Sequence, residues 1–299
     1  MPLTDNKIRT FLSLADTRSY TQTAKKLGLT QPAVSHQIQQ LEYEYGSKMF
    51  SRVKGKLKLT PQGEIIRRYA LQVDSLSERA AMALGDSVSG VSRLSVGVTQ
   101  TAGETFVPKI LPLYLEQHPS ARVTVTSDSL KKLCDRLLHY ELDFAVVDGS
   151  PVIEELDTAL LARDRVAAIL PPDHPLASRD SVTPDDLRGE RFITRPKKSG
   201  TRAIFSDYLA SLGESEDMLT ASVEIDSAYM IKRLVADGVG VSVMGMSACR
   251  REAESGLIAA VPFSGEGMTR EISALCRRDY AGRNILGELI SLYDSMPEE

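Results

Sequence analysis

The stretch SYTQTAKKLGLTQPAVSHQIQQL, residues 19–41, decides how the N-terminal part of this chain folds. Thr21 is a good N-cap for a short helix, and Gly28 stands where a helix ends in a left-handed residue. Thr30 then caps a second helix, whose first turn tolerates Pro32. Two helices joined by so short a turn, with glycine at the break, predict a helix-turn-helix. A further helix precedes this pair, because apolar residues recur at helical spacing from Ile8 to Ala15.

The helix after Thr30 has two faces. At 100° per residue, Val34, Ile38 and Leu41 form a narrow stripe that packs on the other helices. The opposite face is polar, and glutamine at the start of a helix pairs bidentately with adenine in the major groove. A merely solvated face is the alternative. The residues predicted to read base edges are Gln31, Pro32, Ser35, His36 and Gln39.

A basic hairpin follows the helix-turn-helix. Residues 49–53 and 56–59 are predicted strands, and glycine lies in the turn between them. Leu57 and Leu59 alternate with lysines, so one face is buried and the other is cationic. Cationic side chains on a hairpin suit the phosphate contacts that dominate DNA affinity. The predicted backbone contacts are Arg52, Lys54 and Lys56, and the whole arrangement predicts a winged helix.

The charge distribution agrees with a DNA-binding head on a different body. The 299 residues carry a net charge of −4, which alone argues against a nucleic-acid partner. Residues 1–60, however, hold ten basic and four acidic side chains, whereas the remainder holds 26 basic and 36 acidic ones. A basic head and an acidic body are typical of a DNA-binding module fused to another module.

The first 63 residues resemble the N-terminal signature of LysR-type transcriptional regulators. Two departures are mild: Thr23 replaces the usual alanine, and Met49 the usual leucine before Phe50. The residues that carry the resemblance are Phe11, Ser19-Tyr20-Thr21, Ala24, Leu27, Thr30-Gln31-Pro32-Ala33-Val34-Ser35-His36-Gln37-Ile38, Leu41-Glu42, Gly46, Met49-Phe50-Ser51-Arg52 and Leu59-Thr60-Pro61-Gln62-Gly63.

A long helix is predicted after Thr60, with Pro61 at its favoured first position. Apolar residues three and four apart form a seam close to the repeat of paired helices. Packing on its own domain is the alternative, but the preceding head is too small to cover so long a stripe, so we expect dimerisation through residues 61–84. Residues 85–90 form a small, polar stretch, predicted to be a linker. The seam residues are Ile66, Tyr69, Val73, Leu76, Ala80 and Ala83.

From residue 92 onward, predicted strands alternate with predicted helices, which indicates an α/β domain with a mostly parallel sheet. The strands are expected at 94–98, 122–126, 143–147, 166–170, 239–243 and 270–276, and the helices at 106–114, 130–140, 202–212, 230–236 and 284–293. Fragments such as His174-Pro175-Leu176-Ala177 and Asp186-Leu187-Arg188-Gly189 resemble the LysR regulatory domain, similar in fold to two-lobed type II periplasmic binding proteins. We therefore expect a winged helix-turn-helix DNA-binding domain at 1–60, a linker and dimerisation helix at 61–90, and an effector-binding domain at 91–299. The resemblance implies that lobe I comprises 91–161 and 267–299, and lobe II 162–266.

No catalytic constellation is evident, and neither an enzyme, a cofactor nor a metal is expected. The four histidines lack metal-ligand spacing, and the run around Ser242 departs from the nucleophile elbow. The glycines near Gly240 open a strand after a helix, the reverse of a dinucleotide site. Cys134, Cys249 and Cys276 are expected to be reduced and buried, although a redox pair brought together by the fold is the alternative. Without a signal peptide or membrane span, we expect a cytoplasmic protein.

The effector site is predicted at the strand ends that face each other across the interlobe cleft. Hydroxyls and helix N-terminal amides there suit a small organic anion, with Arg195 or Arg202 as its charge partner. The alternatives are ordinary helix caps and a solvated basic loop. The predicted residues are Thr99, Gln100, Thr101, Ser127 and Ser129 from one lobe, and Thr194, Arg195, Ser199, Thr201 and Arg202 from the other.

These observations favour an effector-controlled, sequence-specific DNA-binding transcriptional regulator. Its expected partners are double-stranded DNA with an interrupted palindrome, a small-molecule effector, RNA polymerase and further copies of this chain. The family resemblance implies a tetramer built by pairing regulatory domains. Two other classes remain open: a small-molecule enzyme with a DNA-tethering head, and an architectural DNA-binding protein whose body only oligomerises.

Overall fold

A computed structural model describes residues 5–89, 92–197, 199–265, 267–280 and 283–294. The chain divides into two compact units. One comprises Met1–Leu94 with Ser120–Arg122 and Asp135–Leu142, and the other comprises the rest of the chain. Within the described ranges, no helix is long and apolar enough to cross a bilayer.

The N-terminal unit begins with the three helices α1 (Asn6–Thr17), α2 (Tyr20–Leu27) and α3 (Gln31–Glu44). The prediction that Thr21 caps α2 is wrong. Ser19 has an extended backbone and its Oγ accepts a hydrogen bond from the Gln22 amide at 3.3 Å, so the helix begins before Thr21. Gly28 ends α2 with a φ of 66°, and Thr30 Oγ1 caps α3 by accepting from the Ala33 amide, as predicted.

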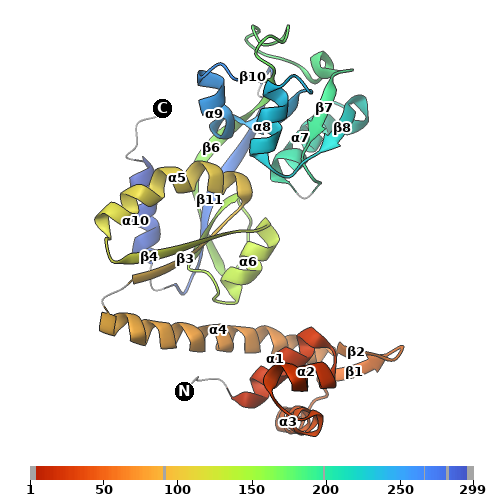
Figure 1. Ribbon diagram of the computed structural model, residues 1–299, viewed down its shortest axis with the longest axis vertical. Helices are drawn as coiled ribbons and strands as arrows, with labels where there is room; N and C mark the ends of the chain where they lie inside the picture. The colour runs from red at the N-terminus through yellow and green to blue at the C-terminus, as the bar shows by residue number, and fades with distance from the viewer. Residues whose placement is uncertain (1–4, 90–91, 198, 266, 281–282, 295–299) are drawn as a thin grey trace. The chain divides into compact units, whose positions relative to one another are not determined.

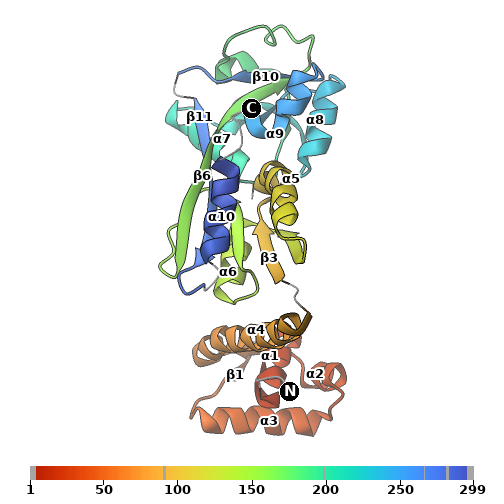
Figure 2. The ribbon, with the colours of Figure 1, turned by 90° about the vertical axis from the view of Figure 1, so that its left-hand side faces the viewer.

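The core of this unit lies where α1 packs on α3 and α4 (Pro61–Ser89), and Figure 2 shows α1 between these two helices. Phe11, Leu14, Ile38 and Leu41 are at most 2% exposed, and Met49 is fully buried. Each such side chain contributes about 1.5–3 kcal/mol by leaving water. The predicted apolar stripe of α3 is therefore the buried one, and its polar face is left outside.

The predicted hairpin is present as β1 (Phe50–Val53) paired antiparallel with β2 (Lys56–Leu59) (Figure 1). Lys54 and Gly55 form the turn with φ of 51° and 76°. Two consecutive positive φ values match the right-handed twist of the strands that they join. Together, the helices and the hairpin make a winged helix-turn-helix.

Helix α4 continues through Ser89, so the prediction that residues 85–89 form a linker is wrong. A single glycine costs a helix only about 1 kcal/mol and does not end it. Near the end of α4, Asp86 Oδ1 accepts a hydrogen bond from Arg93 Nε at 2.9 Å. Gly90, the last residue of the predicted linker, lies outside the described residues. Ile66 of the predicted seam packs into the head core. The large apolar residues of α4 that are at least 43% exposed, among those whose burial is described, are Ile65, Tyr69, Val73, Leu76, Met82 and Leu84.

The second unit contains a sheet in the order β10-β6-β11-β5-β3-β4, with β9 also paired to β6. Two long strands, β6 (Leu156–Leu170) and β11 (Met268–Arg277), run through both lobes, and Figure 2 shows the course of β6. Lobe I adds β3 (Ser92–Val98), α5 (Gln100–Gln117), β4 (Ala121–Ser127), α6 (Leu130–Leu138), β5 (Phe144–Asp148) and α10 (Arg283–Asp294).

Lobe II contains both elements that were predicted from the sequence and elements that were not. The predicted helices and strand are α7 (Gly200–Ser211), α8 (Ala228–Ala236) and β9 (Ser242–Gly245). The others are β7 (Arg191–Thr194), η1 (Pro184–Leu187), η2 (Glu216–Met218), β8 (Thr220–Glu224), α9 (Met246–Glu254) and β10 (Ala259–Pro262). β7 and β8 form a separate parallel pair.

The expectation of a mostly parallel sheet is wrong. β3 and β5 are parallel, but β11 is antiparallel to β5 and β6, and β9 and β10 are antiparallel to β6. The chain leaves lobe I along β6 and returns along β11, so these two crossing strands must run in opposite directions. Their pairing sets Arg270 directly opposite Asp164, beside a register shift at Ile272/Ser273.

Candidate functional site

The polar face of α3 is presented to solvent. Gln31, Pro32, His36 and Gln39 are exposed, and Ser35 is half-buried. On a helix with 3.6 residues per turn, Pro32, His36 and Gln39 lie within about 60° of one another, so they form one stripe along the helix. The structure thus places three of the five residues predicted to read base edges on one stripe, whereas Ser35 and Gln31 are rotated by about 60° and about 100° from Pro32.

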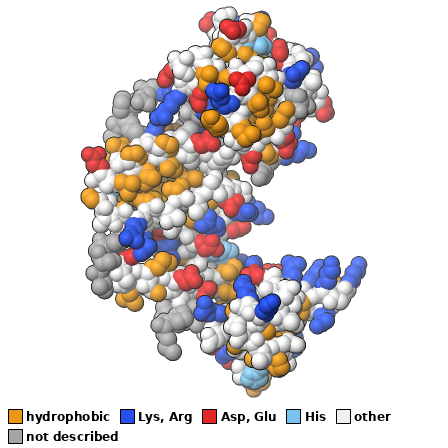
Figure 3. Space-filling view, in the orientation of Figure 1, with side chains coloured by type: hydrophobic (Ala, Val, Ile, Leu, Met, Phe, Trp, Pro, Cys, Tyr) orange, Lys and Arg blue, Asp and Glu red, His pale blue; other side chains and the backbone are white. Residues whose placement is uncertain are grey.

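The hairpin carries the cationic residues predicted to contact phosphates. Arg52, Lys54 and Lys56 are exposed, as is Lys58, and Figure 3 shows the blue side chains gathered on this projection. Leu57 and Leu59 turn the other way and pack against the core. The hairpin therefore has the predicted amphipathic construction.

Glu42 joins α3 to the base of the hairpin, a role that the sequence did not reveal. Its side chain is 9% exposed, and Oε1 accepts from the backbone amides of Met49 at 2.9 Å and Phe50 at 3.4 Å. Oε2 accepts from Lys48 Nζ at 2.6 Å. The available signal in the sequence was a carboxylate directly after Leu41 of the apolar stripe, in a head with more basic than acidic side chains. Gly63 completes this junction, because a Cβ there would lie 2.2 Å from the Met49 carbonyl oxygen.

In lobe I, the predicted effector residues lie at the ends of β3 and β4. Thr101 is 4% exposed in the first turn of α5. The Thr99 hydroxyl donates to Asp148 Oδ2 at 2.8 Å and accepts from the Asp148 amide at 3.0 Å, so it is already engaged. At the end of β4, Ser127 is exposed and Ser129 half-buried.

In lobe II, Arg195 follows β7 and is 6% exposed. Its Nη2 donates to Gln100 Oε1 of lobe I at 3.2 Å and lies 3.7 Å from Asp226 Oδ1. Its Nε is buried without a hydrogen-bond partner, and burial lowers the pKa of this guanidinium, with Asp226 opposing the effect. A buried guanidinium with an unused N–H is the kind of group that an anion satisfies.

The Arg202 guanidinium already donates hydrogen bonds to neighbouring groups. It donates to both carboxylate oxygens of Glu216 at 2.7–3.0 Å, to Glu224 Oε2 at 2.9 Å and to the Arg195 carbonyl at 2.7 Å. The hydrogen bond to Glu216 raises the pKa of Arg202. Of the two arginines predicted as charge partners, only Arg195 keeps an unused buried N–H. Thr201 is buried beside Arg202, Ser199 is half-buried, and the Thr194 hydroxyl donates to the Arg195 carbonyl.

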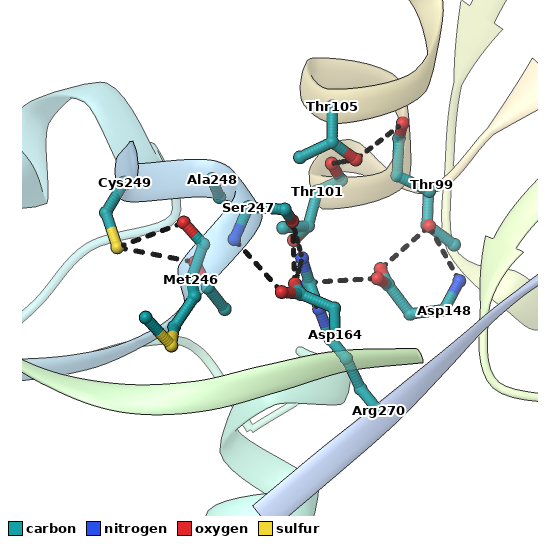
Figure 4. Close-up of polar contacts among 12 residues, drawn as sticks. Thr99, Thr101, Thr105, Asp148, Asp164, Met246, Ser247, Ala248, Cys249 and Arg270 are labelled. Atoms are coloured by element: carbon teal, nitrogen blue, oxygen red, sulfur yellow. Dashed lines mark hydrogen bonds and ion pairs between the residues drawn. The ribbon is translucent and has the colours of Figure 1, made fainter. Parts of the chain in front are cut away.

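A buried ionic network joins the lobes beside Thr99 and Thr101 (Figure 4). The Arg270 side chain is 0% exposed and donates from Nε to Asp164 Oδ2 at 2.7 Å and from Nη1 to Asp148 Oδ1 at 3.0 Å. Ser247 at the start of α9 donates its amide and hydroxyl to Asp164. Sequence reasoning missed Asp148, Asp164, Ser247 and Arg270, although charges inside apolar strands were a signal.

The three cysteines are free and buried. Cys249 donates from Sγ to the Gly245 and Met246 carbonyls at 3.5 Å. Burial raises the pKa of its thiol to about 12, with Asp164 acting in the same direction. Among the described residues no cluster of three or more His, Cys, Asp or Glu side chains is placed to hold a metal ion.

Family models match both parts of the chain. One described as "Bacterial regulatory helix-turn-helix protein, lysR family" matches residues 6–64, and one described as "LysR substrate binding domain" matches residues 89–294. A probable RuBisCO transcriptional regulator of Guillardia theta is 30% identical over 92% of this chain and 90% of its own length. The corresponding protein of Emiliania huxleyi is 29% identical over 94% of this chain and 91% of its own length.

Solved structures share the fold. Full-length CbnR complexed with its target DNA is 18% identical, covers 96% of this chain and 98% of its own, and superposes with a TM-score of 0.68. A full-length point variant of OxyR from Pseudomonas aeruginosa is 21% identical over 97% of this chain and 94% of its own, with a TM-score of 0.64. The winged helix-turn-helix and the two-lobed α/β domain are thus the architecture of known regulators.

Proposed function

The chain belongs to the LysR family of bacterial transcriptional regulators, and on this premise we propose which residues bind DNA and which bind the effector. It is a DNA-binding regulator with an effector-binding domain. We assign base recognition to Gln31, Pro32, Ser35, His36 and Gln39. Phosphate contacts are assigned to Arg52, Lys54 and Lys56. The observation that supports this assignment is the exposed polar stripe of α3 beside an exposed cationic hairpin.

Selection of duplexes from a random pool with the full-length chain tests the DNA-binding assignment. Enriched sequences are expected to hold an interrupted palindrome. On the selected duplex, Gln31→Ala is expected to relax the preference at one base pair and to cost about 1–3 kcal/mol. Gln117→Ala, which removes an exposed amide of α5, is the matched control. Unchanged affinity and base preference in Gln31→Ala would show that α3 is assigned the wrong role.

The exposed apolar residues of α4 support a dimer as the DNA-binding form. Tyr69, Val73 and Leu76 are 43–55% exposed along one helix, and exposed apolar stripes of this kind pair with a second helix. A two-fold dimer places its half-sites about one helical turn apart. We further propose that regulatory domains pair to form a tetramer. Sedimentation of a monomer at micromolar concentration, together with DNA binding as a monomer, would contradict this proposal.

The effector is proposed to be a small organic anion held between Arg195 and the N-terminus of α5. The single observation behind this assignment is the buried Arg195 Nε without a partner, on a side chain that already reaches Gln100 of the other lobe. A ligand carboxylate would replace the weaker neutral contact to Gln100 with a charge-assisted hydrogen bond. Thr101 is the nearby hydroxyl we assign to the site, together with Gln100, Ser127, Ser129, Thr194, Ser199 and Thr201.

A library of metabolites screened by thermal shift identifies the effector. Calorimetry with that compound then compares Thr101→Ala and Thr99→Ala with Lys132→Ala, which removes an exposed side chain of α6. Loss of affinity is expected in the threonine variants. Because Thr99 is bound to Asp148, its effect is expected to be the smaller of the two. Unchanged affinity in both would move the site elsewhere.

The remaining assignments follow from this mechanism. We propose that ligand binding shifts the two-lobed domain between conformations and so changes how paired heads engage DNA. The proposed functional segments are the DNA-binding domain at 1–60, the dimerisation helix segment at 61–90 and the effector-binding domain at 91–299. We also propose that the protein contacts RNA polymerase and acts in the cytoplasm. We also propose that the chain is not an enzyme. If a compound that binds is also turned over, the chain is instead a DNA-tethered enzyme. If no compound in the library binds, the chain is instead an architectural DNA-binding protein.

A further inference from the structure

Tyr43 lies in the last turn of α3 and is 88% exposed. Its hydroxyl makes no hydrogen bond to the described residues. A single exposed aromatic residue is common on protein surfaces and by itself requires no explanation. The position of this one on α3, its charged neighbours and its distance from the predicted base-reading residues together point to a role.

The helical repeat places Tyr43 on the stripe assigned to base recognition. At 100° per residue, Tyr43 is rotated by about 20° from Pro32, about 20° from His36 and about 40° from Gln39. It therefore lies on the centre line of the exposed stripe rather than at its edge. The next tyrosine, Tyr45, is rotated by about 200° from Tyr43 and points away from the stripe.

The carboxylates on either side of Tyr43 are neutralised. Glu42 is buried and bound to Lys48 and to the hairpin backbone, while Glu44 Oε1 forms an ion pair with Lys7 Nζ at 2.5 Å. Unpaired carboxylates here would repel DNA phosphates. With both of them paired, the phenol is left as an uncharged, exposed hydrogen-bond donor on this end of the stripe.

The distance of Tyr43 along α3 determines which part of the bound DNA its side chain can contact. Tyr43 lies eleven positions after Pro32, about 16–17 Å along the axis at 1.5 Å per residue. The major groove is about 12 Å wide, and a recognition helix contacts bases with its N-terminal residues. A side chain so far along the same stripe therefore lies over the groove wall, where tyrosine is among the residues that bind phosphate oxygens.

We propose that Tyr43 is a further DNA-binding residue, whose phenol donates a hydrogen bond to a backbone phosphate at the edge of the major groove. The inference rests on the proposed role of α3. It adds an uncharged contact beyond Gln39. The contact orients the helix on the duplex without reading sequence.

Binding of the full-length chain to its selected duplex tests the proposal with Tyr43→Phe and the matched control Tyr45→Phe. Tyr45 is also exposed, at 54%, and the same single oxygen is removed. Tyr43→Phe is expected to weaken binding about tenfold per half-site, since a hydrogen bond to a charged group is lost. The dependence on salt should be unchanged, because a neutral phenol releases no counterion, and the selected sequence should be unchanged. Tyr45→Phe should bind as the wild type does.

Three results would overturn the proposal: wild-type affinity in Tyr43→Phe, an altered base preference, or an equal loss in Tyr45→Phe. Far-ultraviolet circular dichroism of each variant excludes loss of the helix as the cause. Failure of the wild-type chain to select any sequence would instead refute the proposed function. Wild-type affinity of Tyr43→Phe beside a weakened Gln31→Ala would refute only the role of Tyr43.

Discussion

Replacement of Arg270 by methionine removes the group that joins two buried carboxylates of different lobes. The Asp164 side chain is 6% exposed and the Asp148 side chain is 10% exposed. Water therefore reaches neither carboxylate well enough to solvate its charge in place of the guanidinium. Removal of one partner from a buried ion pair costs about 3–5 kcal/mol, because the other charge stays buried and uncompensated. For a unit of about 200 residues, each kcal/mol lowers Tm by about 2–4 °C. Arg270→Met is therefore expected to lower the Tm of the regulatory domain by about 6–20 °C.

Differential scanning calorimetry measures this effect, with Arg163→Met as the matched control. Arg163 lies on β6 next to Asp164 and pairs with Glu271 of β11 at 3.4 Å, but its side chain is 67% exposed. An exposed pair of this kind contributes about 0–1 kcal/mol, so the control should unfold close to the wild type. Addition of Asp148→Asn and Asp164→Asn to Arg270→Met should recover part of the loss, because no buried charge then lacks a partner.

If Arg270→Met lowered the free energy of unfolding by less than about 1 kcal/mol, this expectation would be refuted. It would mean that the carboxylates find water or another partner once the guanidinium is gone. An equal loss in the Arg270 single variant and the triple variant would refute the explanation by uncompensated charge. That result would assign the stability to packing of the arginine side chain alone.

Three further predictions concern the hairpin, the thiols and the response to pH. Lys56→Ala should weaken binding to all duplexes similarly and lower the slope of log K against log salt by about 1; a change in sequence preference would contradict its assignment to the backbone. The native chain should not react with Ellman's reagent at Cys249 within minutes at neutral pH, since a thiol with a pKa of about 12 is almost wholly protonated, and rapid labelling there would show that the site opens. Arg202 holds the pKa of Glu216 below its usual 4.5, so their pair stabilises the fold above that pH and is lost as pH falls through the lowered pKa. The Tm difference between wild type and Glu216→Gln should thus narrow in acid, and a difference that grows there would contradict this.

The winged helix-turn-helix was predictable because its determinants are local. The Gly28 and Thr30 caps, the Lys54-Gly55 turn and the apolar stripe of α3 each depend on residues within a few positions of one another. The error at Thr21 is of the same local kind, since Ser19 and Thr21 are both good caps and only the backbone conformation distinguishes them.

Lobe II was harder to predict from sequence. The strand β7 has only four residues, Arg191–Thr194, and both Phe192 and Ile193 are buried, so no alternating pattern marks it. The α9 segment, Met246–Glu254, has charged residues in its second half and buries only Ala248 and Cys249. Short elements with few buried residues, such as these, are set by the surrounding lobe.

The network around Arg270 depends on contacts far apart along the chain. Arg270 and Asp164 are 106 positions apart, and they meet only because β6 and β11 pair in one particular register. Thr99 and Thr101 lie at the end of β3, as the sequence predicted, and their role in effector binding stays a prediction. The hydrogen bonds from Thr99 to Asp148 and from Arg195 to Gln100 join residues 49 and 95 positions apart, so no local sequence pattern reveals them.

The most direct test of effector-controlled DNA binding is a titration of the selected duplex with full-length chain, with and without the compound found by thermal shift. Effector control predicts a change in DNA affinity of about 5–150-fold, and an equal change in effector affinity when DNA is present, because the coupling between two sites is reciprocal. Identical DNA affinity and an identical footprint with and without saturating effector would contradict it.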